Sequence, residues 1–205
     1  MEHSLGFTEI SQRLAHARSV SSTVACDHKL AAVALILREN SCGLELFFIE
    51  RARHPHDPWS GNIGLPGGRM ELRDADLRQT AERETMEEVG IDLRDASYLG
   101  RLSDVVGANL PVRVACFVYG LTGQVELEFS HEVHDAFWFD LHALGESHRH
   151  VAATVHFEGR PVEAPAILLH QHRPVLWGIT YRLVSQFRQI VEAGAAPAIP
   201  YELPL

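Results

Sequence analysis

Runs of apolar residues rich in Val and Ile alternate with polar turn residues along much of the chain. Short apolar runs bounded by turn residues are typical of buried strands. The predicted strands are 30–37, 44–49, 98–103, 112–121 and 135–139. Residues 39–43 are predicted to be the turn that joins the first two strands into a hairpin.

Other segments repeat their apolar residues at the spacing of an α-helix. They are 7–17, a helix that starts after Asp76, 177–193, and a short helix starting at 141–144. Asp76 can cap the second helix, and Gln79 three residues later completes a variant of the capping box. Gly90 is placed to end that helix, because glycine tolerates a positive φ.

Strands and helices mix without strict strand–helix–strand alternation. This pattern predicts an α/β fold with a mixed β-sheet between helices. Residues 30–194 form the predicted domain, with a helical extension at 1–29 and an extended, proline-containing tail at 195–205. Residues 54–69 hold too many prolines and glycines for a regular element, and a loop of this length is usually functional.

The charge balance and the cysteines limit the possible partners. A net charge of -9 argues against nucleic acid, because duplex binding needs a basic face. Three scattered cysteines argue for a reducing, cytoplasmic location. We expect no secretory signal and no membrane partner, since the longest apolar run is far below the ~20 residues that span a bilayer. The apolar closing helix packs on its own domain or on a second subunit, which leaves a homodimer open.

Three glutamates near the end of the capped helix are the strongest chemical signal. Glu84, Glu87 and Glu88 share one helix face, where like charges cost roughly 0.2–0.5 kcal/mol per pair. A divalent cation turns that repulsion into attraction, and magnesium prefers oxygen ligands shared with phosphates. Considered alone, such a trio more often forms a solvated acidic face.

The neighbours of the glutamates favour the metal site. Gly67 and Gly68 lie shortly before the helix and allow close approach of a backbone to a ligand. Arg83 precedes the trio and can orient a carboxylate through a charge-assisted hydrogen bond.

Residues 83–91, Arg-Glu-Thr-Met-Glu-Glu-Val-Gly-Ile, resemble the second half of the Nudix hydrolase signature. The first half departs from it: Gly68 lies one residue further from Arg83 than in the signature, and Ala75 stands where its early glutamate falls. The nearby acids are Glu71, Asp74 and Asp76. The resemblance runs from about residue 30 to 187 and implies an α/β/α sandwich with a catalytic loop–helix motif.

The longer spacing between Gly68 and Arg83 resembles the coenzyme A diphosphatase branch of that family. Residues 59–68 and 176–180 are similar to motifs of the branch, and 131–139 to a motif of the family. Residues 57–60 and Leu65 differ from the branch pattern, which leaves a sister group with another substrate open.

The resemblance implies metal-assisted attack of water on a diphosphate. Glu84, Glu87 and Glu88, with Gly68, would hold Mg²⁺ or Mn²⁺. Glu88 or Glu84 would also help to deprotonate the water, and Glu132 on a mobile loop is a second candidate base.

Arg51 and Arg69 are the predicted phosphate clamps, because guanidinium binds phosphate through two hydrogen bonds. Gly67 and Gly68 would bring backbone groups close to the metal and the phosphate. Trp59 would stack on a base or cover the cleft.

Simpler roles stay open for three of these residues: a strand-end surface charge for Arg51, a loop anchor for Trp59 and an exposed loop glutamate for Glu132. Two further tryptophans, Trp138 and Trp177, are expected in the core, and Cys116 is expected to be buried packing.

Three functions follow from these residues. The first is hydrolysis of coenzyme A or an acyl-coenzyme A to 3′,5′-ADP and a phosphopantetheine product. The second is the same chemistry on another small nucleotide-containing molecule: NADH, ADP-ribose or a nucleoside triphosphate. The third is a catalytically silent Nudix domain that senses a ligand or binds a protein, against which the retained glutamates argue.

Overall fold

The computed structural model describes residues 5–17, 28–54, 59–107, 111–157 and 159–193. Its helices are α1 (Phe7–His16), α2 (Leu77–Val89) and α3 (Gly178–Ala193). The strands are β1 (Lys29–Asn40), β2 (Gly43–Arg51), β3 (Ile63–Gly64), β4 (Gly67–Arg69), β5 (Ser97–Arg101), β6 (Val105–Val106), β7 (Val112–Leu121), β8 (Val133–Asp140), β9 (His150–Phe157), β10 (Arg160–Ile167) and β11 (Leu176–Trp177). The tail predicted at 195–205 lies outside the described residues.

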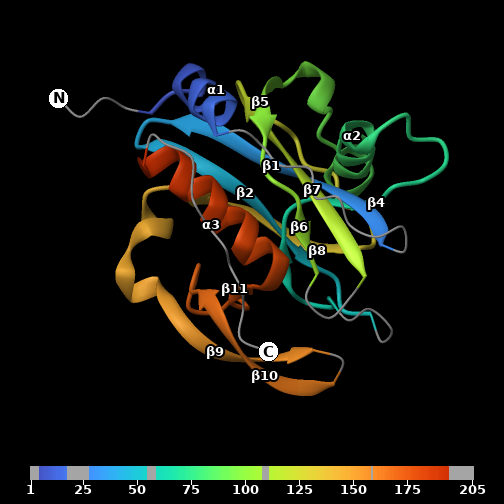
Figure 1. Cartoon of the computed structure of the whole chain (residues 1–205), viewed down its shortest axis with the longest axis vertical. Coiled ribbons are helices and arrows are strands. Elements are labelled where there is room, and N and C mark those ends of the chain that lie inside the picture. Colours follow the sequence, from blue (N-terminus) through green and yellow to red (C-terminus); the bar gives the residue numbers. More distant parts are fainter. Residues whose placement is uncertain (1–4, 18–27, 55–58, 108–110, 158, 194–205) are drawn as a thin grey trace.

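Among the described residues, eight strands form the main sheet, in which β3-β2-β1-β7-β5 run side by side. Strand β4 pairs with β1, β6 with β7 and β8 with β2. The pair β1–β7 is parallel and the other pairs are antiparallel, which confirms the predicted mixed sheet. Figure 1 shows β1, β2 and β7 at the centre of the molecule.

Both faces of this sheet are covered, and β1 shows how the sequence achieves it. Side chains alternate between the two faces of a strand. Leu35 and Leu37 therefore pack in one core with α1 and α3, whereas Ala34 and Ile36 pack in a second core with α2. A strand buried on both faces is apolar throughout, which is why residues 30–37 have no polar alternation. The result is the predicted α/β/α sandwich.

Helix α2 has the predicted ends. The Asp76 carboxylate accepts a hydrogen bond from the Gln79 backbone N–H at 2.8 Å, and the Gln79 side chain accepts one from the Ala75 N–H. At the other end Gly90 adopts φ 75°, in the left-handed region. Thr85, Glu88 and other residues of its inner face are buried against the sheet.

Helix α1 belongs to the same core as α3. Ile10 and Leu14 are almost fully buried and lie in one hydrophobic cluster with Leu183 and Phe187 of α3. The predicted helix at 7–17 is therefore confirmed, while a domain boundary at residue 29 stays a prediction.

Several elements differ from the predictions. The loop 54–69 contains β3 and β4, short strands that add to β2 and β1. The closing helix begins at Gly178, because Leu176 and Trp177 pair with β10 instead. A short helix was predicted to start at 141–144, and the structure has a 3-10 helix there at Ala143–Gly145.

Hairpin β9–β10, which forms a second sheet with β11, is absent from the elements that the sequence predicts. Most of its residues are exposed or half-buried, and β10 contains Pro161 and Pro165. It therefore lacks the apolar alternation that identifies a half-buried strand. Figure 1 shows this hairpin below α3, at one end of the molecule.

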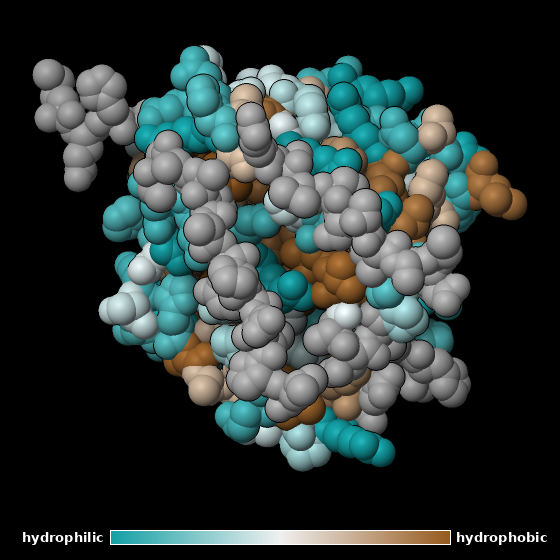
Figure 2. Space-filling view, viewed as in Figure 1, coloured by the Kyte–Doolittle hydropathy of each residue, from teal (hydrophilic) through white to brown (hydrophobic). Residues whose placement is uncertain are grey.

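The surface is largely polar on the face drawn in Figure 2, with a hydrophobic patch near its centre. No helix among the described residues is long and apolar enough to cross a membrane.

Candidate active site

Helix α2 lies against β4, so its acidic face meets the two glycines of that strand. Gly68 is directly beneath Glu84: a Cβ on Gly68 would lie 2.5 Å from the Glu84 carboxyl carbon. Gly67 has φ 148° and leaves no room for a side chain, because a Cβ there would overlap the Ala32 carbonyl oxygen. Glycine is therefore required at both positions for this close approach.

Glu88 is the buried member of the trio. Its carboxylate accepts a hydrogen bond from the Gly67 N–H at 2.8 Å and lies 3.6 Å from Arg51 Nη1. Burial raises the pKa of Glu88 to about 7, although the Gly67 N–H and Arg51 oppose the shift. Glu88 thus anchors the helix to β4 and β2.

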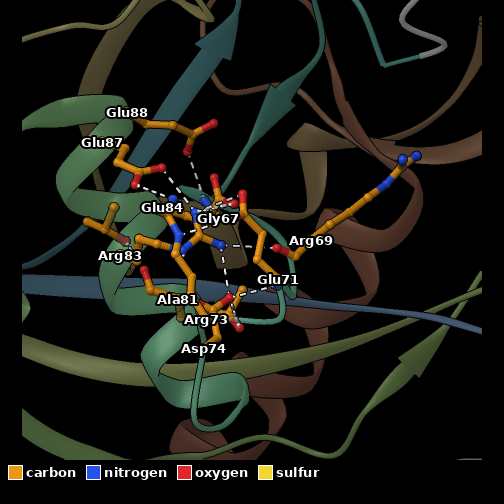
Figure 3. Close-up of polar contacts among 12 residues, drawn as sticks. Gly67, Arg69, Glu71, Arg73, Asp74, Ala81, Arg83, Glu84, Glu87 and Glu88 are labelled. Atoms are coloured by element: carbon orange, nitrogen blue, oxygen red, sulfur yellow. Dashed lines mark hydrogen bonds and ion pairs between the residues drawn. The ribbon is translucent and has the colours of Figure 1, made fainter.

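Arg83 connects the remaining carboxylates (Figure 3). Its Nη1 donates to Glu84 at 2.9 Å and to Glu87 at 3.0 Å. Its Nε and Nη2 donate to the two oxygens of Asp74 at 2.8 and 3.0 Å, and Nη2 also donates to the Arg69 carbonyl oxygen. The predicted orienting role of Arg83 thus has matching contacts in the structure.

Asp74 is a residue that sequence reasoning missed. Its side chain is 1% exposed and also accepts hydrogen bonds from the Glu71 N–H and the Thr80 hydroxyl. The Arg83 guanidinium holds the pKa of Asp74 well below its usual range. The sequence held a signal for it: Ala75 stands where the family signature has its early glutamate, and Asp74 is the acidic residue directly before it.

The carboxylates of this site disfavour one another's charge. Burial raises the pKa of Glu84, and the negative charges of Glu87 and Glu132 raise it further, against the effect of Arg83. Among the described residues no three potential metal ligands converge, because the glutamates face Arg51, Arg73 and Arg83. The donor set nevertheless fits a hard divalent cation: carboxylate oxygens on adjacent helical turns, beside a glycine backbone.

A cavity of about 520 Å³ opens beside the acidic helix. Its walls include all five residues that the sequence assigned to substrate binding, Arg51, Trp59, Gly67, Gly68 and Arg69, and two of the predicted catalytic residues, Glu84 and Glu132. Arg51 lies between two acids, because its Nη2 is 3.9 Å from Glu132 as well as close to Glu88. Three predicted catalytic residues, Arg83, Glu87 and Glu88, are next to these but do not line the cavity.

An aromatic corner of the cavity is formed by Trp59 and Trp177, whose ring centroids lie 6.2 Å apart. Trp59 also packs on Phe157 at 5.5 Å, and the Trp177 indole N–H donates to the Asn62 side chain at 3.1 Å. The expectation that Trp177 is a core residue is wrong: it is half-buried and faces the cavity, because β11 places it opposite Ala166 at the end of β10.

Trp138 is also half-buried, packing on Phe47 with Arg38 over its outer ring face, so it is not a core residue either. Cys116 is fully buried in β7 as expected, and burial raises the pKa of its thiol.

An α/β/α sandwich that places a glycine-rich strand against three helical glutamates presents oxygen ligands of the kind that a hard divalent cation prefers. The model of the NUDIX domain family matches residues 27–158, more than half of the chain, so the chain belongs to the Nudix family.

The chain is similar to an uncharacterized protein of Schizosaccharomyces pombe, with 39% identity over 104 residues. That match covers 47% of this chain and 32% of the relative, so the chain spans only about a third of the relative's length.

Two solved structures share the fold. The NUDIX domain of Shewanella oneidensis NrtR, solved with ADP ribose, is 18% identical with a TM-score of 0.55, covering 83% of this chain and 92% of that one. A MutT/nudix family protein from Enterococcus faecalis is 18% identical with a TM-score of 0.54, covering 84% and 66%.

Proposed function

We propose that this Nudix hydrolase cleaves the diphosphate bond of coenzyme A or an acyl-coenzyme A, releasing 3′,5′-ADP and a phosphopantetheine product. One observation carries the proposal: a single cavity brings Glu84 and the Gly67–Gly68 backbone together with arginines and an aromatic corner. The longer Gly68–Arg83 spacing and the resemblance of residues 59–68 and 176–180 to the coenzyme A branch favour this substrate.

Glu84, Glu87 and Glu88, with the backbone of Gly68, would hold Mg²⁺ or Mn²⁺. The ion would neutralise charge on the phosphoryl oxygens and supply an activated water. Burial, and to a smaller extent repulsion between the carboxylates, raises the pKa values of Glu84 and Glu88, and a bound cation would favour their charged forms.

Arg51 and Glu132 have separate roles in this proposal. Arg51 reaches the cavity between Glu88 and Glu132, where its guanidinium can bind a diphosphate oxygen. Glu132 lines the same cavity and has a side chain that is 55% exposed, so we assign it the general base. Glu88 is a poorer base because Gly67 and Arg51 already hold its carboxylate.

Trp59 would contact the base of the nucleotide, since it lies in the aromatic corner of the cavity. Stacking on an aromatic ring does not require one particular base. NADH or ADP-ribose is therefore the second candidate substrate, supported by the ADP ribose solved with the NrtR domain of the same fold.

The test is a substrate panel with a matched pair of variants. Wild-type protein would be incubated with coenzyme A, acetyl-coenzyme A, NADH, ADP-ribose and dGTP at millimolar Mg²⁺ or Mn²⁺, and the products separated by chromatography. Glu84→Gln should lose activity by about 100-fold or more, as for removal of a group that stabilises transition-state charge. Glu82→Gln is the control, because Glu82 lies on the same helix but binds Arg78 and Tyr119.

Metal-dependent release of 3′,5′-ADP from coenzyme A, lost only in Glu84→Gln, would support the proposal. Turnover of another compound, again lost only in Glu84→Gln, would support the proposed site but show that the substrate is not coenzyme A. No turnover in the whole panel would contradict the catalytic proposal and favour the ligand-sensing alternative.

A further inference from the structure

The part of the cavity wall formed by β1 and β4 carries positive charge. Lys29, Ala31 and Val33 of β1 alternate with residues that face α2, and all three line the cavity. Arg69 pairs with Ala31 across β1 and β4, and Val112 pairs with Lys29 across β1 and β7. Lys29 and Arg69 therefore project from the same face of the sheet, at the edge of the same cavity.

The two cations are close enough to bind one anion. Arg69 is diagonal to Lys29 across an antiparallel pair, which separates such residues by about 7–8 Å at the backbone. Both side chains are long and exposed, so their charged ends can converge. Figure 3 shows the Arg69 side chain extending away from Glu84, Glu87 and Glu88, while its backbone carbonyl receives Arg83.

No described residue neutralises the charge of either side chain. Within the described part of the chain, Lys29 and Arg69 make no side-chain hydrogen bond or ion pair, whereas the arginines beside the acidic helix, Arg51, Arg73 and Arg83, all face carboxylates. Two unpaired like charges at the edge of one cavity repel each other. An anion placed between them would be attracted by both.

We propose that Lys29 and Arg69 form a second anion subsite, which takes a phosphate monoester that the substrate carries apart from the diphosphate that is cleaved. The inference rests on the proposed diphosphatase function and deepens it. Arg69 follows Gly68 directly, and two residues of extended strand, about 7 Å, separate it from Gly67 at the acidic site. A doubly charged monoester close to the diphosphate matches the two cations.

The subsite predicts a preference between substrates that differ by one phosphate. The pairs are coenzyme A against 3′-dephospho-coenzyme A, and NADPH against NADH. Lys29→Gln and Arg69→Gln should each lower the ratio of kcat/KM within a pair by about tenfold, the effect of one charge-assisted hydrogen bond, mainly through KM. Arg160→Gln is the control, because the Arg160 side chain also makes no hydrogen bond or ion pair with a described residue but lies on β10 outside the cavity.

Binding of two non-hydrolysable probes tests the subsite without turnover. Calorimetry with Mg²⁺ would compare adenosine 3′,5′-bisphosphate with 5′-AMP for the wild type and the same variants. Tighter binding of the bisphosphate, lost in Lys29→Gln and Arg69→Gln, supports the subsite even if no substrate in the panel is cleaved. Equal affinity for the two probes, or an equal loss for both in the variants, would overturn it, whether or not the enzyme turns over coenzyme A.

Discussion

Asp74 has the most complete set of partners of any carboxylate at the site. It receives two hydrogen bonds from Arg83 and one each from the Glu71 N–H and the Thr80 hydroxyl. Through Arg83 it fixes the positions of Glu84 and Glu87. Asp74 is therefore a positioning residue that acts on the proposed metal ligands without reaching the cavity.

Replacing Asp74 should destabilise the fold strongly. Asp74→Asn leaves Arg83 without its buried counter-charge, and breaking a buried pair costs about 3–5 kcal/mol. Asp76→Ala, which removes only the helix cap, should cost about 1 kcal/mol. Urea unfolding of both variants would give the comparison, and equal losses would contradict the central role of Asp74.

Glu88 should make the metal-free protein less stable as pH rises. Burial raises its pKa to about 7, so between its ordinary value and pH 7 the folded state keeps a proton that the unfolded state has lost. Glu88 therefore favours folding at low pH, and that contribution disappears as pH increases through 7. Glu88→Gln keeps the acceptor for the Gly67 N–H and cannot ionise.

The measurement is unfolding of wild type and Glu88→Gln in EDTA between pH 5 and pH 8. The variant should match the wild type near pH 5 and exceed it by on the order of 1–3 kcal/mol at pH 8. Taking the difference cancels titration of other groups, such as His170, whose pKa burial lowers. A constant difference across this range would show that Glu88 titrates normally in the folded state.

At the scale of elements, β4 and α2 pack together, and substitutions at the two glycines of β4 can test stability and activity separately. Gly68→Ala places a methyl group against the Glu84 carboxylate, which is the end of a flexible side chain and can turn away. Gly67→Ala places it against the backbone of β1, at a φ that other residues rarely adopt.

The two substitutions should therefore have different effects. Gly68→Ala should fold with a loss of about 1 kcal/mol or less and lose most of its activity, because Glu84 is displaced. Gly67→Ala should lose several times more stability, since β4 must separate from β1. Thermal unfolding with parallel activity assays would distinguish them, and an active Gly68→Ala protein would argue against Glu84 as a metal ligand.

The sequence predicted the ends of an element correctly where neighbouring residues determine them. Asp76 and Gly90 end α2 through bonds and dihedral angles that neighbouring residues supply. Hairpin β9–β10 was missed because its strands are held by pairing with each other over eight residue pairs, and few of its side chains are buried. Pairing between main chains leaves little trace in the order of apolar and polar residues.

At the scale of the whole molecule, α1 contributes to the core that supports the cavity. Ile10 is fully buried beside Leu183 and Phe187 of α3, and Leu183 also lines the cavity. Ile10→Ala should therefore cost about 2–5 kcal/mol, the range for truncation of a large buried side chain. Thr8→Ala, at an exposed position of the same helix, should stay within about 0.5 kcal/mol of wild type.

Denaturant unfolding of the two variants decides whether residues 1–29 are an extension or an integral part of the domain. A small effect of Ile10→Ala would favour a separable extension.

The cytoplasmic location and the possible homodimer stay predictions, as do the small-molecule substrate and the exclusion of nucleic acid.

The sequence by itself determined the buried strands, the ends of α2 and the three glutamates on one helical face. These features depend on residues close together in the chain, whose periodicity and capping act locally. Only the tertiary structure decided that Asp74, rather than a residue at position 75, holds Arg83, and that Trp177 faces the cavity. It also placed Lys29 beside Arg69, because strand register joins residues that lie forty positions apart in sequence.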